Sequence, residues 1–398
     1  MIQLSKRVQG AQGSATLAMA AKAKMLAAQG HHVISFATGE PDFDTPQRIK
    51  NAAKKSLDAG FTKYVQVGGI PELIAAIQQK LKRDNKLDYT ADEIMVTCGA
   101  KDAIFTALMV LLNEGDEVII PAPYWVSFPE QVKIAGGVPR MVATDAKHGF
   151  RLTPEQLERA ITPRTRVLIL NSPSNPTGAA YTGDVLKKIA DIAVQHHLVI
   201  LSDEIYEKLV YDGFTHVSTA ATSEAAKLQT ITINGVSKTY AMTGWRMGFA
   251  AGPKEVIAKM KTIQGQQISG ITSFIQPACA EAFLGPQDDV EMMRKEFSAR
   301  RKLMHERLTA IPHIQCHMPE GAFFHFPNVQ YYLGKRGPRG PITDANTLAE
   351  VLLEEAHVAV VSGDASGAPG FIRLSYATSR ENIEEGIERI KSVLVKLL

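Results

Sequence analysis

The chain has 398 residues, of which 45% are hydrophobic and 21% charged, and its formal net charge at pH 7 is +3. This composition is typical of a globular protein of two or three domains, and the small positive excess argues against nucleic acid and membranes as partners. No apolar run reaches about eighteen residues, and the first residues lack the apolar core of a signal peptide, so we expect a cytoplasmic protein. The three cysteines show no CxxC or Cys/His spacing, which fits a reducing compartment and predicts no metal site.

In chain order, short apolar runs alternate with segments of helical periodicity. This alternation predicts an α/β fold with a largely parallel sheet that helices cover on both faces. The predicted strands span residues 94–98, 117–120, 138–142, 167–170, 198–202, 230–233 and 247–251. Ligands of such sheets bind outside the carboxyl ends of the strands, so the residues that follow these runs are the first candidates for a site.

The first candidate segment, residues 98–102, joins a predicted strand to a helix predicted over residues 103–112. Its small residues Gly99 and Ala100 would let backbone amides approach an anion at the positive end of the helix. A strand-to-helix turn also needs glycine for structural reasons, so this segment alone is weak support for phosphate binding. Walker-type and GxGxxG loops are missing, which argues against nucleotide cofactors.

Two further strands end in polar residues. The turn over residues 170–178 would present the side-chain amide of Asn175, which could bond to the phenolate oxygen of an aromatic cofactor. The next strand ends in Asp203 and Tyr206, and a buried carboxylate is costly unless it is paired. Asp203 could keep a pyridine nitrogen protonated while the Tyr206 hydroxyl reaches the ring oxygen. The structural alternative is a helix N-cap at Asp203 with Tyr206 in the core.

Residues 235–248 place a lysine, Lys238, eight positions before an arginine, Arg246. The lysine could form a Schiff base with the aldehyde of pyridoxal phosphate (PLP), and the guanidinium could bind the phosphate. Taken alone, such residues are more often surface charges. Later in the chain, a charged helix is predicted over residues 290–308, and the phenylalanines at 323, 324 and 326 are assigned to the core.

Several motifs together resemble the class I, fold-type I aminotransferases, and specifically the bacterial aspartate aminotransferases of subgroup Ib. The matching segments are residues 5–9, 39–46, 62–64, 123–127, 171–178, 202–207, 235–248 and 371–377, in the order of that family. The resemblance implies a mostly parallel seven-stranded sheet in a large PLP-binding domain, residues 47–284. It also implies a smaller α+β domain formed by residues 285–398 with the N-terminal segment, residues 1–46.

The resemblance also implies the roles of individual residues. Lys238 would hold PLP and act as the catalytic base, Asp203 would pair with the pyridine nitrogen, and Tyr206 would contact the ring oxygen. The other expected cofactor contacts are Asn175, Trp125, Ser237, Gly99, Ala100, Lys101, Arg246 and Tyr64, the last from the second subunit of a homodimer with shared active sites. Substrate would contact Arg373, Gly39, Trp125, Asn175 and Lys101, with Arg373 gripping the α-carboxylate.

The expected reaction is ping-pong transamination of L-aspartate with 2-oxoglutarate, giving oxaloacetate and L-glutamate. In the resembling subgroup, the lysine at position 101 and the segment around Ser14 and Thr16 hold the acidic side chain. Gln12 replaces a lysine of some relatives that accept prephenate, and Gly235 replaces a phosphate-binding serine. An aromatic or prephenate aminotransferase and a β-elimination lyase on the same fold stay open as alternatives, with a non-catalytic PLP-binding protein as a further one.

Overall fold

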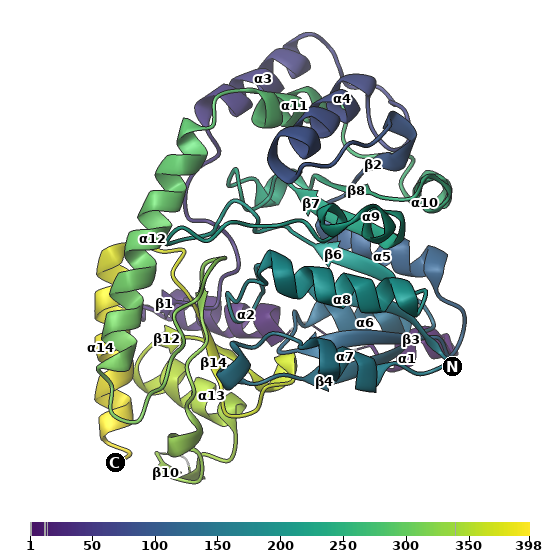
Figure 1. The fold of residues 1–398 in the computed structure, drawn as a ribbon. Helices are drawn as coiled ribbons and strands as arrows, with labels where there is room; N and C mark the ends of the chain where they lie inside the picture. The colour runs from purple at the N-terminus through teal and green to yellow at the C-terminus, as the bar shows by residue number, and fades with distance from the viewer. Residues whose placement is uncertain (1, 12, 14, 339) are drawn as a thin grey trace.

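A computed structural model describes residues 2–11, 13, 15–338 and 340–398 (Figure 1). A seven-stranded sheet with strand order β2-β8-β7-β6-β5-β3-β4 forms its centre. These strands are β2 (Ile94–Thr97), β3 (Glu117–Ala122), β4 (Val138–Ala143), β5 (Thr165–Asn171), β6 (Val199–Asp203), β7 (Thr230–Gly235) and β8 (Gly248–Ala251). Each of the seven predicted strands is therefore confirmed, with ends that shift by at most three residues.

Only β8 runs antiparallel to its neighbours, which are β2 and β7. The other pairs are parallel, so the carboxyl ends of six strands lie along one edge of the sheet. Because β8 is reversed, its first residue, Gly248, lies at that same edge opposite Thr97 and Gly235. The residues that precede β8 therefore reach the edge where ligands are expected.

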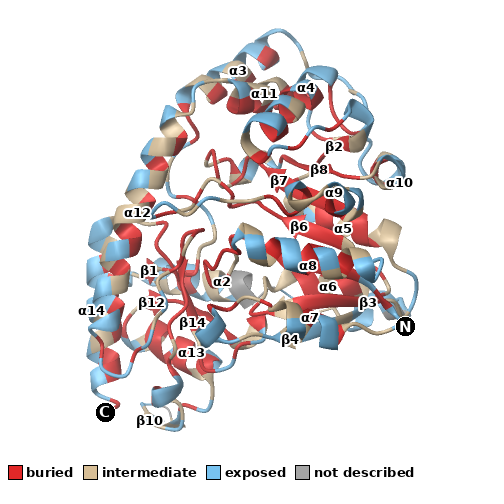
Figure 2. Ribbon diagram, viewed as in Figure 1, coloured by how far each residue is buried: buried red, intermediate tan, exposed pale blue. Residues whose placement is uncertain are grey.

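Helices cover both faces of this sheet (Figure 2), as the pattern predicted. One face packs against α5 (Ala100–Leu111), α6 (Ser127–Ile134) and α10 (Lys254–Gln267), and the other against α7 (Pro154–Ala160), α8 (Gly183–Gln195) and α9 (Glu224–Gln229). Successive residues of β5 alternate between the two cores: Val167 and Ile169 face the first, and Leu168 and Leu170 the second. This alternation is the period of two that a strand imposes.

A separate apolar core lies beside the sheet, toward the C-terminus (Figure 1). Here α12 (Asp288–Thr309) packs along α14 (Arg380–Val395), and α13 (Ala345–Glu355) lies against two short strands. The predicted core position of the phenylalanines is confirmed, since Phe323, Phe324 and Phe326 are all buried. The short strands of this region are β1 (Ile34–Ser35), β9 (Phe324–His325), β10 (Arg336–Gly337), β11 (Gly340–Pro341), β12 (Val358–Ala359), β13 (Val361–Ser362) and β14 (Ile372–Ser375).

The remaining helices frame these two cores. At the far end of the sheet, α3 (Gln47–Asp58), α4 (Pro71–Lys80) and α11 (Gln276–Leu284) share a further core. The N-terminal segment carries α1 (Lys6–Gln9) and α2 (Ala15–Ala28), and its strand β1 pairs in parallel with β12. One-turn helices complete the structure: Leu81–Asn85, Ala91–Glu93, Ala146–His148, Thr219–Thr222, Thr243–Trp245, Gln330–Tyr332 and Asp364–Ser366. None of the described helices is both long and apolar enough to cross a membrane.

A buried ion pair ties α4 to the segment that follows β6. Lys80 and Glu207 are in contact with side chains only 3% and 4% exposed, and Asn85 bonds to both of them. Removing one partner of such a pair leaves the other charge buried and uncompensated. The pair therefore holds the segment behind the carboxyl edge of the sheet in place.

We expect Lys80→Met to lower the free energy of unfolding by about 3 kcal/mol or more, because Glu207 would lose its counterion. Urea unfolding followed by circular dichroism would measure the loss. Lys82→Met is the matched control, because Lys82 and its partner Asp88 are 71% and 78% exposed. Such an exposed pair contributes little, so equal losses in the two variants would show that burial of the Lys80 pair is not what stabilises it.

Candidate active site

A cavity of about 580 Å³ lies at the carboxyl edge of the sheet. It is lined by Gly39, Ala100, Lys101, Trp125, Ser127, Asn171, Asn175, Asp203, Ile205, Tyr206, Ser237, Lys238, Thr243, Arg246 and Arg373. These side chains come from segments spread over most of the chain. The lining includes every site residue predicted from the sequence except Gly99 and Tyr64.

Lys238 follows β7 and is partly buried in the cavity wall. Its amine, Nζ, donates a hydrogen bond to the backbone carbonyl of Gly39 at 2.5 Å. Burial lowers the pKa of Lys238 to about 8, although Glu40 opposes this change by favouring the charged form. A substantial fraction of the amine is therefore neutral near physiological pH, as a nucleophile and proton carrier needs to be.

Asp203 ends β6 and is only 5% exposed. Its carboxylate accepts a hydrogen bond from the Ile205 amide at 3.2 Å, and burial raises its pKa to about 7. No helix begins at Asp203, because residues 205–208 form a turn, so the N-cap alternative is wrong. A buried carboxylate with a raised pKa at a cavity is typical of a functional group that awaits a cationic partner.

Tyr206 both packs in the core and lines the cavity, which are the two positions that the sequence left open. Its ring packs edge-on against Phe323 and Phe324, with centroids 5.4 and 5.9 Å away, so it is part of the core. It also lines the cavity, and burial raises the pKa of its phenol above the ordinary value. The hydroxyl therefore stays protonated and can donate a hydrogen bond.

Arg373, in β14, is 4% exposed and brings a full positive charge into the cavity wall. Its Nη1 donates to Asn175 Oδ1 at 2.9 Å, and its Nη2 donates to the Ala37 carbonyl at 2.6 Å. The guanidinium lies 4.5 Å from the ring centre of Phe324, and burial lowers its pKa to about 10. Two of its five donors are thus occupied, and the buried Nε has no partner among the described residues. The remaining donors suit a carboxylate.

The opposite end of the cavity is built for an anion. Gly99 precedes α5 with a φ of 81°, a conformation that favours glycine, and the helix begins at Ala100. Arg246 reaches this helix end, where its Nη2 donates to the Cys98 carbonyl at 3.3 Å and its Nη1 to the Thr243 carbonyl at 3.0 Å. Among the described residues no carboxylate pairs with Arg246, so its charge is available to a ligand.

Two glycines allow this close packing. A Cβ on Gly248 would lie 2.4 Å from the Ala100 nitrogen, so glycine is needed where β8 passes the start of α5. A Cβ on Gly235 would lie 2.7 Å from the Met247 carbonyl oxygen. A serine side chain at position 235 would therefore collide with β8, which packs tightly against β7.

Lys101 and Trp125 lie together in the cavity wall. The Lys101 Nζ is 4.9 Å from the centre of the Trp125 ring, a cation–π distance, and Trp125 packs edge-on against Phe128. Burial lowers the pKa of Lys101, and the nearby Arg246 charge acts in the same direction. The cavity thus holds cations at two separate places, around Lys101 and at Arg373.

Among the described residues, Tyr64 is the predicted side chain that lies away from this cavity. It is 96% exposed and lines a separate hollow of about 500 Å³ formed by residues 62–65 and 268–274. Gly99 lies at the rim of the site, in contact with Arg246 rather than lining the cavity. Gln12 and Ser14 fall outside the described residues, as does the side chain of Thr16.

Sequence reasoning missed several cavity residues. Asn171 accepts a hydrogen bond from the Asn175 amide at 2.8 Å and donates to the Asp203 carbonyl at 3.2 Å, so it fixes both neighbours. Thr243 lines the cavity and donates to Glu40 at 2.8 Å. Both lie inside segments that the family resemblance had already marked, which was the available signal. Ser127 and Ile205 complete the set.

Comparison with known proteins identifies the family. Residues 31–390 match the family model described as aminotransferase class I and II. The chain belongs to the class I and II aminotransferases. It is 50% identical to an aspartate aminotransferase of Geobacillus stearothermophilus, with 98% of each chain covered. It is 48% identical to an aspartate/prephenate aminotransferase of Cereibacter sphaeroides, again with 98% of each chain covered. A solved aspartate aminotransferase from Rhizobium meliloti has a TM-score of 0.97 at 45% identity, covering 100% of both chains.

The cofactor of these aminotransferases is PLP, and the donor set of this site fits it. An amine of lowered pKa and a buried carboxylate flank the cavity, and an unpaired arginine stands at a helix N-terminus. Only glycine at positions 99 and 248 fits the close packing around this helix end, and Ala100 at the start of the helix lines the cavity. One cavity therefore brings together groups that fit this cofactor.

We expect Gly248→Ala to weaken PLP binding by roughly tenfold or more, equivalent to about 1.4 kcal/mol, because the new methyl group would displace the start of α5. Titration of cofactor-free protein with PLP, followed by absorbance, would measure the dissociation constant. Gly244→Ala is the control, since a Cβ at Gly244 meets no atom within 4 Å. Unchanged affinity in the Gly248 variant would contradict this account of the helix end.

The raised pKa of Asp203 predicts a pH-dependent effect of Asp203→Asn on the cofactor-free protein. The folded-state pKa of about 7 exceeds the ordinary aspartate value of 3.8, so the folded protein holds the extra proton between these values. Stability from this group therefore falls as pH rises through that window. Relative to wild type, the Asn variant should be more stable at about pH 8.5 than at about pH 5, which urea unfolding would measure. A difference independent of pH would contradict the shifted pKa.

Proposed function

We propose that this aminotransferase transfers the amino group of L-aspartate to 2-oxoglutarate, giving oxaloacetate and L-glutamate by a ping-pong mechanism. The observation that carries the proposal is the pair of cationic groups at different places in one cavity, Arg373 and Lys101. A dicarboxylic amino acid presents two carboxylates, and each would meet one of these cations. The names of the relatives from Geobacillus and Rhizobium point the same way.

Arg373 would bind the α-carboxylate common to all amino-acid substrates. A guanidinium holds a planar carboxylate with two parallel hydrogen bonds, and this one is already oriented by Asn175 and Ala37. Because Arg373 is buried, its charge is poorly screened by water, so the attraction to a carboxylate is strong. This residue would fix the position of the amino acid's α-carbon.

Lys101 would bind the side-chain carboxylate. Its amine lies over the Trp125 ring in the cavity wall, and partial desolvation together with the nearby Arg246 charge lowers its pKa, although the residue as a whole is exposed. The subgroup resemblance implies that Ser14 and Thr16 would also contact the side-chain carboxylate of the substrate. Because Lys101 lies near Arg246, it could contact the cofactor phosphate as well. This arrangement supports a preference for acidic amino acids.

The cofactor would be held by residues at the carboxyl edge of the sheet. Gly99, Ala100, Lys101, Ser237 and Arg246 would surround the phosphate. Asp203 would accept a hydrogen bond from the ring nitrogen, and Asn175 and Tyr206 would donate to the ring oxygen, with Trp125 against the ring. Bound PLP supplies an electron sink that lets the α C–H bond of the amino acid break.

Lys238 would act first as the attachment point of the cofactor and then as the base that moves the α-proton. Its lowered pKa keeps a share of the amine neutral, and its hydrogen bond to Gly39 holds it at one place in the cavity. A base that is positioned in this way and tuned near the working pH is efficient in both directions of proton transfer. Asp203, once paired with the cofactor nitrogen, would be held in its ionised form.

We further propose a homodimer in which Tyr64 reaches the phosphate site of the second subunit. In one chain this tyrosine is 96% exposed beside a hollow of about 500 Å³, a placement that suits a contact between subunits. Gly39 would contribute to substrate binding within its own subunit. The three cysteines are free, which supports a cytoplasmic location.

We propose two domains, a large PLP-binding domain of residues 47–284 and a smaller one of residues 285–398 joined by residues 1–46. The parallel pairing of β1 with β12 supports the grouping of the N-terminal segment with the C-terminal part. The main alternative activity is that of an aminotransferase for aromatic amino acids or prephenate. The name of the Cereibacter relative and the aromatic face of Trp125 in the cavity favour it.

L-Aspartate should change the visible absorbance of the protein-bound PLP and yield oxaloacetate in a stoichiometric half-reaction, and 2-oxoglutarate should restore the original spectrum. L-Phenylalanine should act far more weakly, because its side chain offers Lys101 no carboxylate. Lys238→Ala, the control for the catalytic amine, should lose turnover by roughly 10²–10⁴-fold or more. A response to phenylalanine alone would move the assignment to the aromatic branch. Release of pyruvate and ammonia from L-serine, which carries a hydroxyl leaving group on its β-carbon, would indicate β-elimination.

A mixture of two inactive variants should regain activity if Tyr64 serves the second subunit. One variant would carry Lys238→Ala and the other Tyr64→Ala, and the two would be unfolded together and refolded, or coexpressed. In the mixed dimer, one site combines an intact Lys238 with an intact Tyr64 from the other chain. Activity in the mixture above the sum of the two separate variants is expected. No gain, with mixed dimers verified by affinity tags, would place Tyr64 outside the neighbouring site.

A further inference from the structure

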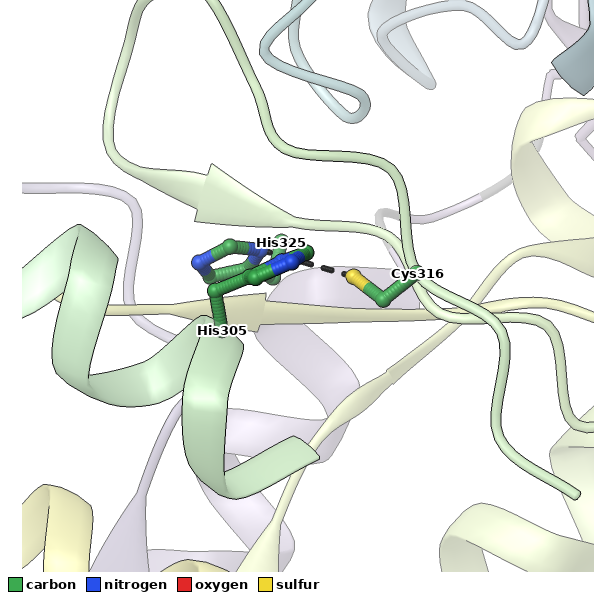
Figure 3. A group of neighbouring side chains, drawn as sticks. All are labelled: His305, Cys316 and His325. Atoms are coloured by element: carbon green, nitrogen blue, oxygen red, sulfur yellow. Dashed lines mark hydrogen bonds between the residues drawn. The ribbon is translucent and has the colours of Figure 1, made fainter. Parts of the chain in front are cut away.

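Two histidines and a cysteine that the aminotransferase reaction does not use lie together in the C-terminal part of the chain (Figure 3). His305 is on α12, Cys316 lies in the segment after it, and His325 is in β9. One ligand atom from each residue lies within 4.8 Å of the others. Figure 3 shows the sulfur of Cys316 pointing toward the imidazole rings. No short sequence motif predicts this group, because its residues come together only when α12 and β9 pack against each other.

The spacing is close to that of a zinc site. Bond lengths of about 2.0 Å to nitrogen and 2.3 Å to sulfur put tetrahedral ligand atoms about 3.5 Å apart. The Cys316 Sγ and the His325 Nδ1 are 3.4 Å apart. The widest separation, at most 4.8 Å, needs a movement of about 1 Å, which rotation of the partly exposed His305 side chain can supply.

The hydrogen bonds of the two imidazole rings leave a ring nitrogen of each histidine available to bind a metal. The His325 Nε2 lies 2.9 Å from the Arg301 carbonyl, to which it can only donate, so the Nδ1 that faces Cys316 carries the lone pair. A ligating histidine usually donates its other N–H to such an acceptor. The Nδ1 of His305 is buried and has no hydrogen-bond partner among the described residues.

The surroundings of Cys316 do not favour a reactive thiol. Burial raises the pKa of Cys316 and lowers that of His325, which disfavours a thiolate–imidazolium pair. Burial also lowers the pKa of His305. Nucleophilic and redox-sensing cysteines need a lowered pKa instead. Neutral imidazoles are already the metal-binding form, and a divalent ion can displace the thiol proton to solvent.

A second group, Glu204, Glu207 and His216, has comparable proximity. It differs because its carboxylates are already satisfied: Glu204 accepts hydrogen bonds from Ser202 and Ser218, and Glu207 is paired with Lys80. A metal ion would have to break these bonds. The histidine–cysteine group would lose only weak thiol contacts, from Cys316 Sγ to the His325 ring and to the His317 carbonyl.

We propose that His305, Cys316 and His325 bind one Zn²⁺ ion per chain, with water as the fourth ligand. The reaction is Zn²⁺ plus the thiol giving a zinc-bound thiolate and one released proton. Both His305 and Cys316 are partly exposed, which gives the ion a path from solvent. The bound ion would link α12 to β9, whose Phe324 contacts Arg373, and would thereby stabilise the part of the chain behind the substrate-binding arginine.

Equilibrium dialysis of the purified holoenzyme against Zn²⁺, after treatment with a chelator, tests the stoichiometry. We expect one tightly bound ion per chain in the wild type and an increase in Tm with Zn²⁺ concentration. Cys316→Ser and His305→Gln should each weaken binding by about tenfold or more and remove the Tm increase. His148→Gln is the control, since His148 is an exposed histidine beside an acid outside the group. Wild-type binding no tighter than in both variants would overturn the proposal.

Cd²⁺ gives a second measurement that identifies the sulfur ligand directly. A thiolate-to-cadmium charge-transfer band should appear in the ultraviolet difference spectrum of the wild type and of His148→Gln, and it should be absent from Cys316→Ser. Retained far-ultraviolet circular dichroism and cofactor absorbance would verify that each variant is folded. A band that persists in Cys316→Ser would place the ion on another cysteine and overturn the site. Neither readout depends on transaminase activity, so the proposal stands or falls separately from the substrate assignment.

Discussion

Three ionisable groups of one cavity, Lys238, Asp203 and Arg373, are held out of bulk water, and the rest of the site depends on this constraint. Burial disfavours the charged form of each, with pKa values moved to about 8, 7 and 10. The cavity gives them no countercharges of their own beyond one another and Glu40. A ligand that carries a phosphate, a ring nitrogen and a carboxylate would supply the missing partners. Binding of such a ligand would therefore be favoured by charged groups that the fold already holds in position.

The sheet topology is what brings these groups to one place. Six parallel strands end at the same edge, and the reversed β8 delivers Arg246 to that edge from the opposite direction. This arrangement requires close packing. Where β8 passes the start of α5, the space beside the Cα of Gly248 is too small for a side chain. The start of α5, Arg246 and Gly248 are therefore packed together, and a change in any one of them would displace the other two.

Much of this arrangement could be predicted from the sequence because its signals are local. The seven strands are short apolar runs bounded by turns, and Asp203 follows a strand whose end is buried. The reversal of β8 could not be predicted, because direction is set by packing with β2 and β7 and not by the residues of the strand. The role of Asn171 as a support for Asn175 and Asp203 could not be predicted either, because it depends on two hydrogen bonds that form only in the folded chain. The histidine–cysteine group likewise depends on the contact between α12 and β9.

Arg373 is held in place by residues from two distant parts of the chain. Its guanidinium is oriented by a carbonyl from the N-terminal segment, Ala37, and by the amide of Asn175 from the edge of the large sheet. The side-chain oxygen of Asn175 accepts the hydrogen bond from Arg373 while its backbone nitrogen donates to Asn171, so this residue connects Arg373 to the end of β5. Any movement of the C-terminal part relative to the sheet must carry Arg373 along or break this bond. Substrate carboxylate bound at Arg373 would then favour the arrangement in which both parts meet, which is how ligand binding can drive closure of a site.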